Sequence, residues 1–223
     1  MLSCLAGCAV LVALAGCGGS SSSDSGVASE SPQKILSDSL AAAKGLKTVH
    51  AAGTVNSGGQ HILLDIQLVG GKGGQGQITL NGLAFKLVGL NNYAYMQAPP
   101  AVWEKAGAPA SAAQQLQGKW LRTPATGQFA SIASLTNLNT LFTQLLTQHG
   151  KSLKSGGEST VAGQKVVAVK SDQGTLYVAA TGKPYPVEIV KPGSDGGKID
   201  FDRFNQAVTL SAPTNTVNLP SAG

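Results

Sequence analysis

The chain has 223 residues, a formal net charge of +5 and a pI near 9.2. Only 12% of the residues are charged and 5% are aromatic, while 29 are glycine, so the composition excludes a charged disordered chain and a coiled coil. The 16 Lys and Arg residues are spread along the sequence, which argues against a nucleic-acid-binding arm. The length suits one folded domain behind a tail.

The first 17 residues contain all three cysteines, at positions 4, 8 and 17. The apolar run from Leu5 to Ala15 has the length of a signal-peptide core and is too short to span a bilayer, which takes about 20 helical residues. No Lys or Arg precedes Lys34, so we expect a basic segment upstream of the printed start. The stretch "GGSSSSDSG" follows Cys17 and is typical of a flexible tether.

Residues Leu14, Ala15, Gly16 and Cys17 resemble the lipobox of bacterial lipoproteins. The resemblance implies cleavage before Cys17 and a diacylglyceryl group on its thiol. An earlier copy of the same four letters ends at Cys8, and we interpret it as apolar filler of the signal. We therefore expect a signal peptide at 1–16, a lipidated Cys17 with its tether at 17–30, and a thiol-free domain at 31–223.

An amphipathic helix is expected to open the domain. Ser31 is the candidate N-cap, Pro32 suits the first helical position, and Gly45 lies near the end. The apolar period then changes to two in "HILLDIQLVGG", "GQITLNG", "LAFKLVGL" and "NYAYMQ", with turns at Gly70–Gly76, Asn81-Gly82 and Asn91-Asn92. These short spacings predict an antiparallel meander.

Residues 99–150 change character and then give way to a second strand-rich region. "SAAQQLQ" predicts a short helix, "GKWLRTP" an extended crossing, and the leucines between Phe129 and Gly150 one or two helices. About four strands follow, with hairpin turns at "SDQG", "ATGKP" and "GSDGG". The order predicts an α+β fold with one large antiparallel sheet.

This order of elements, with "GKW" before the helices and "FDRFNQAVTLSAP" near the end, resembles the LppX/LprG group of bacterial lipoproteins over roughly residues 32–220. The resemblance implies a LolA-like fold, in which one curved antiparallel sheet forms a half-open barrel with helices over its concave face. It also implies a function, because members of that group bind acylated lipids between sheet and helices and pass them across the cell envelope.

The physics of such a fold also favours a cavity, because helices laid across a curved sheet do not fill its concave side everywhere. The expected cavity lining is Ile62, Leu64, Ile66, Leu68, Ile78, Leu80, Phe85, Leu87, Met96, Leu141, Phe142 and Leu145. Trp103 and Trp120 are candidates for a lipid portal. The alternative for all of these residues is ordinary core packing.

Several motifs are weighed against enzymatic functions. "GGKGGQG" matches GxGxxG but precedes a strand, so we interpret it as a hairpin loop. His50, His61 and His149 lack metal-ligand spacing and are expected on the surface or in turns. Asp200 and Asp202 share a strand face, either as a glycosidase pair or as exposed acids beside Lys198 and Arg203.

The sequence thus predicts a non-enzymatic, monomeric lipoprotein on the extracytoplasmic face of the cell membrane. It is expected to hold an acylated lipid for carriage or presentation, with an envelope transporter as a further candidate partner. No cofactor, metal or nucleic acid is expected. The alternative is a structural or partner-binding envelope lipoprotein with a filled core and no ligand.

Overall fold

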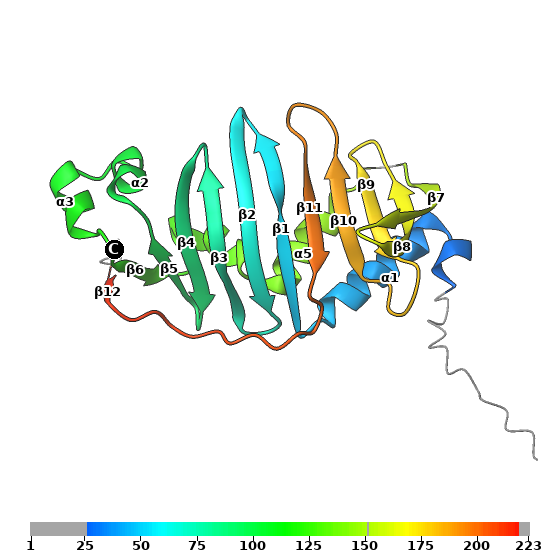
Figure 1. The fold of residues 1–223 in the computed structure, drawn as a ribbon, viewed down its shortest axis with the longest axis horizontal. Helices are drawn as coiled ribbons and strands as arrows, with labels where there is room; N and C mark the ends of the chain where they lie inside the picture. Colours follow the sequence, from blue (N-terminus) through cyan, green and yellow to red (C-terminus); the bar gives the residue numbers. More distant parts are fainter. Residues whose placement is uncertain (1–25, 151, 219–223) are drawn as a thin grey trace, which may run out of the picture.

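The computed structural model describes residues 26–150 and 152–218, and in them twelve strands form one open sheet (Figure 1). The sheet order is β12-β6-β5-β4-β3-β2-β1-β11-β10-β9-β8-β7. All strand pairs are antiparallel except β12 with β6. The expected α+β fold with a single large, open antiparallel sheet is confirmed. Cys17 and the predicted signal peptide lie outside the described residues.

The first half of the domain is a helix followed by a five-stranded meander. Its elements are η1 (Val27–Ser29), α1 (Pro32–Lys44), β1 (Thr48–Ser57), β2 (Gln60–Val69), β3 (Gly73–Leu80), β4 (Leu83–Leu90) and β5 (Tyr93–Gln97). The middle then contains α2 (Pro100–Lys105), α3 (Ala110–Gln115), β6 (Trp120–Pro124), η2 (Gly127–Phe129), α4 (Ala130–Leu135) and α5 (Leu138–Thr147).

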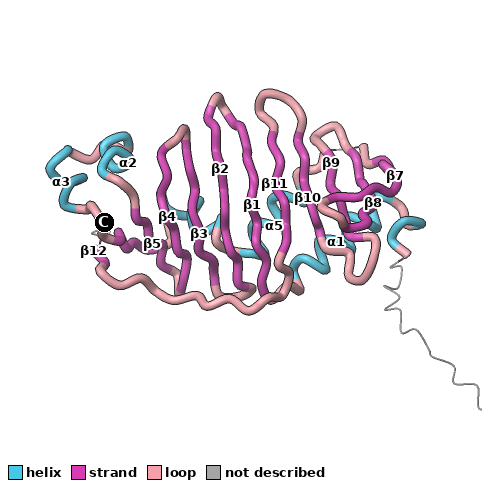
Figure 2. The backbone as a smooth tube through the Cα atoms, in the orientation of Figure 1, coloured by secondary structure: helices cyan, strands magenta, loops and turns pink. Residues whose placement is uncertain are grey.

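The second half is another five-stranded meander and a short final strand. Its elements are β7 (Lys154–Val161), β8 (Gln164–Lys170), β9 (Thr175–Ala179), β10 (Pro186–Lys191), β11 (Gly197–Asp202) and β12 (Thr216–Asn218). The two meanders meet where β1 pairs with β11, with His50 opposite Asp202 and Ala51 opposite Phe201. After β11 the chain runs past the ends of β1, β2, β3 and β4 to reach β12, which pairs with β6 (Figure 1 and Figure 2). The ends of the described chain therefore lie at opposite ends of the sheet.

Helices α1 and α5 lie across one face of the sheet, while α2 and α3 sit at its β4–β6 end (Figure 2). The apolar residues of α5 face the strands, because Leu138, Leu141, Phe142 and Leu146 are all buried. The ring of Phe142 packs against that of Phe201 with 5.0 Å between centroids. This side of the sheet holds the main hydrophobic core, and the helices are its cover.

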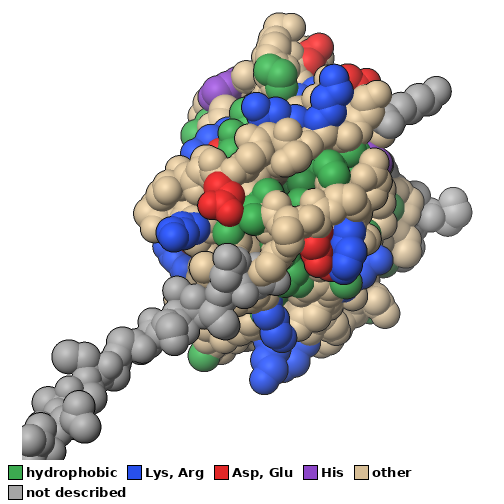
Figure 3. Space-filling view, turned by 90° about the vertical axis from the view of Figure 1, so that its right-hand side faces the viewer, with side chains coloured by type: hydrophobic (Ala, Val, Ile, Leu, Met, Phe, Trp, Pro, Cys, Tyr) green, Lys and Arg blue, Asp and Glu red, His purple; other side chains and the backbone are tan. Residues whose placement is uncertain are grey.

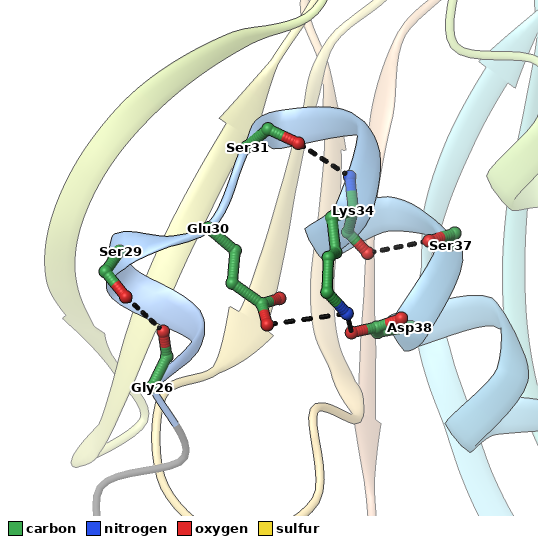
Figure 4. A network of polar contacts seen from close by, with 7 residues as sticks. All are labelled: Gly26, Ser29, Glu30, Ser31, Lys34, Ser37 and Asp38. Atoms are coloured by element: carbon green, nitrogen blue, oxygen red, sulfur yellow. Dashed lines mark hydrogen bonds and ion pairs between the residues drawn. The ribbon is translucent and has the colours of Figure 1, made fainter.

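Helix α1 forms where the sequence predicts it. The Ser31 side chain accepts a hydrogen bond from the Lys34 backbone N–H, and Pro32 occupies the first turn. Lys34 Nζ lies 2.6 Å from Asp38 and 3.5 Å from Glu30 (Figure 4). The hydrogen bond to Asp38, with help from Glu30, raises the pKa of Lys34 above its ordinary value.

Glycines on the helix-covered face let the strands bend inward. Gly53 lies on the same face of β1 as the buried Ala51, and a Cβ at Gly53 would collide with the carbonyl oxygen of Lys198 on β11. A Cβ at Gly76 would collide in the same way with the carbonyl oxygen of Asp65 on β2. Neighbouring backbones approach too closely for any side chain, which is a common way to curve a sheet.

Two of the predicted turns are confirmed, and the third is shorter than expected. Asn81-Gly82 and Asn91-Asn92 connect strands with positive φ angles, including 53° and 61° at the last two. The predicted turn at Gly70–Gly76 was wrong in its second half, because β3 already begins at Gly73. Gly73 and Gly74 pair with Val69 and Leu68 of β2, so hydrogen bonding across the sheet outweighs the low strand propensity of glycine.

Gly76→Ala is expected to lower the free energy of unfolding by about 1–3 kcal/mol, because the added methyl group must displace a strand backbone. Gly45→Ala is the matched control, since a Cβ there lies 3.5 Å from its nearest neighbour and φ is negative. Urea unfolding followed by circular dichroism measures both. Equal stability of the two variants would contradict the role assigned to Gly76.

Candidate functional site

The predicted cavity residues converge on the helix-covered face, where most of them fill the interior. Leu68, Leu87 and Phe142 are fully buried and Ile66 is 1% exposed. Ile78 and Leu141 are also buried, while Ile62, Leu64, Phe85 and Leu145 are partly buried at the margin of the same cluster. Under the middle of α5, sheet and helix therefore meet through interdigitated side chains.

Two predicted residues lie outside this cluster. Met96 belongs to a smaller core with Trp103 and Leu121 beneath α2 and α3. Leu80 is half-buried and pairs with Leu83 across the turn between β3 and β4. The structure thus brings most, but not all, of the predicted residues together.

Two neighbouring hollows remain at the C-terminal end of α5. One, of about 50 Å³, lies among α1, α5, β8 and β9, and the other, of about 180 Å³, lies among α5, β1, β10 and β11. Both are lined by Leu145, Gln148, Gln173 and Ile189. Among the predicted cavity residues, Leu145 is the one that lines both hollows.

The two hollows have apolar walls and a polar rim. Leu36, Leu146, Leu153, Val169 and Leu176 line the smaller one, and Val55, Gly197 and Ile199 line the larger. Gln148, Gln173 and Lys191 are exposed residues of the lining, and the His149 ring donates a hydrogen bond from Nδ1 to the Gly150 carbonyl at 2.9 Å. Apolar walls with polar groups at the rim suit an amphiphile.

Three wider depressions lie elsewhere among the described residues, of which the smallest, about 360 Å³, is lined by Gly53, Leu63 and Leu64 on β1 and β2. The remaining two involve helices. One, of about 420 Å³, is lined by Phe85, Ala98, Pro99 and Pro100 where β4 and β5 meet α2. The other, of about 530 Å³, is lined by the turns at Gly71–Gly73 and Asn91–Asn92 together with α4. Turn and amide groups dominate this last depression, so it lacks the apolar walls that an acyl chain needs.

The tryptophans lie at the β6 end of the sheet, away from the two hollows beside α5. Trp103 on α2 is 6% exposed, and its indole Nε1 donates a hydrogen bond to the Ala98 carbonyl at 3.2 Å. Trp120 begins β6 and is half-buried. Trp103 thus packs as an anchor for α2, and neither side chain lines the hollows beside α5.

The opposite face of the sheet holds a cluster of charged residues near the β1–β11 junction. His50 was expected on the surface or in a turn, which is wrong, because it is 8% exposed. Its Nδ1 lies 2.6 Å from Asp202 and its Nε2 lies 3.0 Å from Asp65. Neighbouring strands supply the three residues, so the imidazole connects β2, β1 and β11 through polar contacts.

Lys198 forms the second part of this cluster. Its Nζ lies 2.6 Å from the buried Glu188 and 3.0 Å from Asp200. The hydrogen bonds that Lys198 donates, first to Glu188 and then to Asp200, raise the pKa of Lys198 above its ordinary value of 10.5. Asp200 and Asp202 are thus each engaged by a neighbouring cation or imidazole.

Residues 26–150 and 152–218 contain neither a metal-binding cluster nor a membrane-spanning helix. No group of three or more His, Cys, Asp or Glu side chains in these ranges is placed to hold a metal ion. None of the helices in the same ranges is long and apolar enough to cross a membrane.

This chain is similar to known proteins in its fold and not in its sequence. No protein-family model matches the chain, and no curated protein matches it in sequence. Among solved structures, LprF from Mycobacterium bovis matches with a TM-score of 0.55 and 17% identity, covering 82% of this chain and 96% of that one. The Mycobacterium tuberculosis lipoprotein LppX matches with a TM-score of 0.50 and 18% identity, covering 81% and 100%.

The chain has the LppX-type fold. The resemblance to the LppX/LprG group that the element order indicated is therefore confirmed for the architecture. Because the sequence identities are only 17% and 18%, these two structures show the fold of this chain and not the chemistry of its site. The site is therefore interpreted from the two hollows beside α5.

Sequence reasoning missed much of the lining of the hollows, including Gln173, Ile189 and Lys191. Ile189 lies in β10, where Pro186, Val187 and Glu188 are all buried and the register shifts between Pro186 and Glu188, so no regular period of two marks the inward face of this strand. The missing information was that β10 and β11 lie beside β1. That neighbourhood depends on pairing between distant segments, which no local pattern reports.

Lys198→Met is expected to lower the free energy of unfolding by about 1–2 kcal/mol, because Glu188 is then buried without its partner. Because the pKa of Lys198 is raised in the folded protein, the contribution of the Lys198–Glu188 ion pair to the free energy of unfolding is fully present below pH 10.5. It is lost as the pH rises through the raised pKa of Lys198. Urea unfolding at neutral pH measures the loss. Adding Glu188→Gln should recover part of it, and no recovery would contradict this pairing.

Proposed function

We propose that the chain is a lipid-anchored envelope lipoprotein that holds an acyl chain of a lipid beside the C-terminal end of α5, for carriage or presentation. The observation that carries the proposal is the pair of neighbouring hollows that share Leu145 and Ile189. Their apolar walls would shelter the hydrocarbon, and Gln148, Gln173 and Lys191 would face the polar headgroup. Each methylene removed from water contributes about 0.8 kcal/mol.

The size of the hollows limits what enters without a structural change. Drug-sized ligands occupy pockets of roughly 300–1,000 Å³, whereas the larger hollow measures about 180 Å³. A full-length acyl chain therefore requires α5 to move away from the strands. Helix α5 packs on the sheet through apolar side chains such as Leu141, Phe142 and Leu146, so an acyl chain could replace the contacts that the movement breaks.

The lipid anchor at Cys17 is the second part of the proposal. It is supported by the Leu-Ala-Gly-Cys sequence after an apolar run and by the shared fold of LppX, which is described as a lipoprotein. Two acyl chains on Cys17 would hold the domain at the membrane far more firmly than one. The anchor would place the hollows beside the bilayer that supplies or receives the cargo.

A second function is favoured by the dense packing under the middle of α5. Phe142 is fully buried, and Phe201 and Leu146 are 2% exposed, so the main core is filled by the chain's own side chains. A filled core of this kind is sufficient for an envelope lipoprotein that binds a protein partner and holds no ligand. The two functions differ in whether a lipid accompanies the purified protein.

Native mass spectrometry of protein purified from a lipid-rich bacterial host is expected to show a noncovalently bound lipid in addition to the acyl groups on Cys17. Leu145→Trp fills the space where the two hollows meet and is expected to reduce the lipid-bound fraction at least about fivefold. Leu83→Trp is the control, because Leu83 is also half-buried but lines neither hollow beside α5. If the chain without substitutions carries no noncovalent lipid, the result supports the partner-binding function instead.

Cys17→Ser is expected to abolish incorporation of a labelled fatty acid and to move the protein from the membrane to the soluble fraction of the cells. Cys8→Ser is the matched control and should leave both unchanged, because the earlier Leu-Ala-Gly-Cys copy is interpreted as part of the signal. Fractionation and autoradiography provide the measurement. Labelling that survives Cys17→Ser would overturn the anchor.

A further inference from the structure

The end of the sheet formed by β7 and β8 is the part of the domain nearest to the predicted anchor. The described chain begins at Gly26, and Val27 is 3% exposed in the hydrophobic core. Ser29 Oγ donates a hydrogen bond to the Gly26 carbonyl, and Lys34 connects Glu30 with Asp38 (Figure 4). These contacts fix the point at which the preceding residues leave the domain.

The reach of the tether is short compared with the sheet. Residues 18–25 lie between Cys17 and Gly26, and a chain of this length can reach at most about 32 Å. Twelve strands at about 4.8 Å spacing extend over about 50 Å. An anchor at Cys17 therefore keeps the β7 end at the membrane, while the β6 end can stand well away from it.

This end carries exposed lysines without acidic partners. Lys154, Lys165 and Lys170 lie on β7 and β8, and Lys183 lies in the turn after β9. All four are exposed, and none forms an ion pair within the part of the chain that the structure describes. Lys34, by contrast, already contacts two carboxylates.

Two of these lysines stand directly opposite each other. Lys154 pairs with Lys170 across the β7–β8 ladder, and like charges in this position destabilise a sheet. An anion between them removes the repulsion. The acids at this end are Glu158 and Asp172, together with Glu30 and Asp38 that share Lys34, so five lysines against four carboxylates leave an excess of one positive charge. Figure 3 looks at this end and shows Lys and Arg side chains around it, with Asp, Glu and hydrophobic side chains among them.

We propose that the β7–β8 end of the domain is a membrane-facing surface that binds anionic lipid headgroups through Lys154, Lys165, Lys170 and Lys183. This proposal rests on the lipid anchor of the proposed function. It adds an orientation, in which the sheet stands end-on with β6 and α3 farthest from the bilayer. Each lysine near an anionic surface strengthens binding about fivefold, and salt screens the attraction.

The test is amide hydrogen exchange, followed by mass spectrometry, of the full chain in its lipid-anchored form. The vesicles contain phosphatidylcholine alone or phosphatidylcholine mixed with phosphatidylglycerol. Peptides covering β7 and the turn at 162–163 are expected to exchange at least about threefold more slowly with phosphatidylglycerol present. Peptides covering α3 should exchange equally on both vesicles, and high salt should remove the difference at β7.

Two matched variants decide the position of the contact. Replacing Lys154, Lys165, Lys170 and Lys183 with Gln should abolish the slower exchange at β7. Replacing Lys72, Lys86, Lys105 and Lys119 with Gln removes the same charge from the other half of the molecule and should preserve it. Unfolding curves confirm that both variants fold.

Equal losses in the two variants, slower exchange at α3, or no effect of phosphatidylglycerol would each overturn the orientation. Failure of the anchor gives a different result, because the protein then stays in solution with phosphatidylcholine vesicles. In that case the soluble chain mixed with phosphatidylglycerol vesicles still reports, through the same β7 and α3 peptides, whether the lysine surface makes contact.

Discussion

Inward bending of a single sheet is the constraint on which this fold depends. Gly53 and Gly76 allow neighbouring backbones to approach on the helix-covered face, where any side chain would collide with a carbonyl oxygen. The bend makes a concave apolar surface that must be covered, and α5 covers it with Leu138, Leu141 and Phe142. Because a straight helix cannot follow a curved sheet to its margins, the hollows appear at the end of α5.

The interface between α5 and the sheet is tightly packed in its middle and open at its C-terminal end, and both features matter for the function. Packing between Phe142 and Phe201 fixes α5 to the centre of the sheet, while Leu145 borders space on two sides. Such a gradient of packing lets one end of a helix yield while the other stays in place. The charged contacts of His50 and Lys198 lie on the opposite face, so they hold the junction of the strands without restricting the helix side.

Much of the fold could be predicted from the sequence because its signals are local. Ser31 and Pro32 mark the start of α1, and Asn81-Gly82 marks a hairpin. The apolar face of the sheet followed from the period of two. The hollows could not be located in this way, because they depend on β1 lying beside β11 and on how closely α5 approaches each strand. The burial of His50 has the same origin, since Asp202 lies 152 positions away in the chain.

The pairing of β1 with β11 also has a consequence for how the polypeptide folds. During synthesis, β1 to β6 are complete long before β11 emerges, and the hydrogen-bonding groups along one side of β1 have no strand to meet. Such an incomplete intermediate is prone to self-association, and closing contacts across so much chain is slow. Productive folding of this protein therefore waits for two segments about 150 residues apart to pair, which makes it slow.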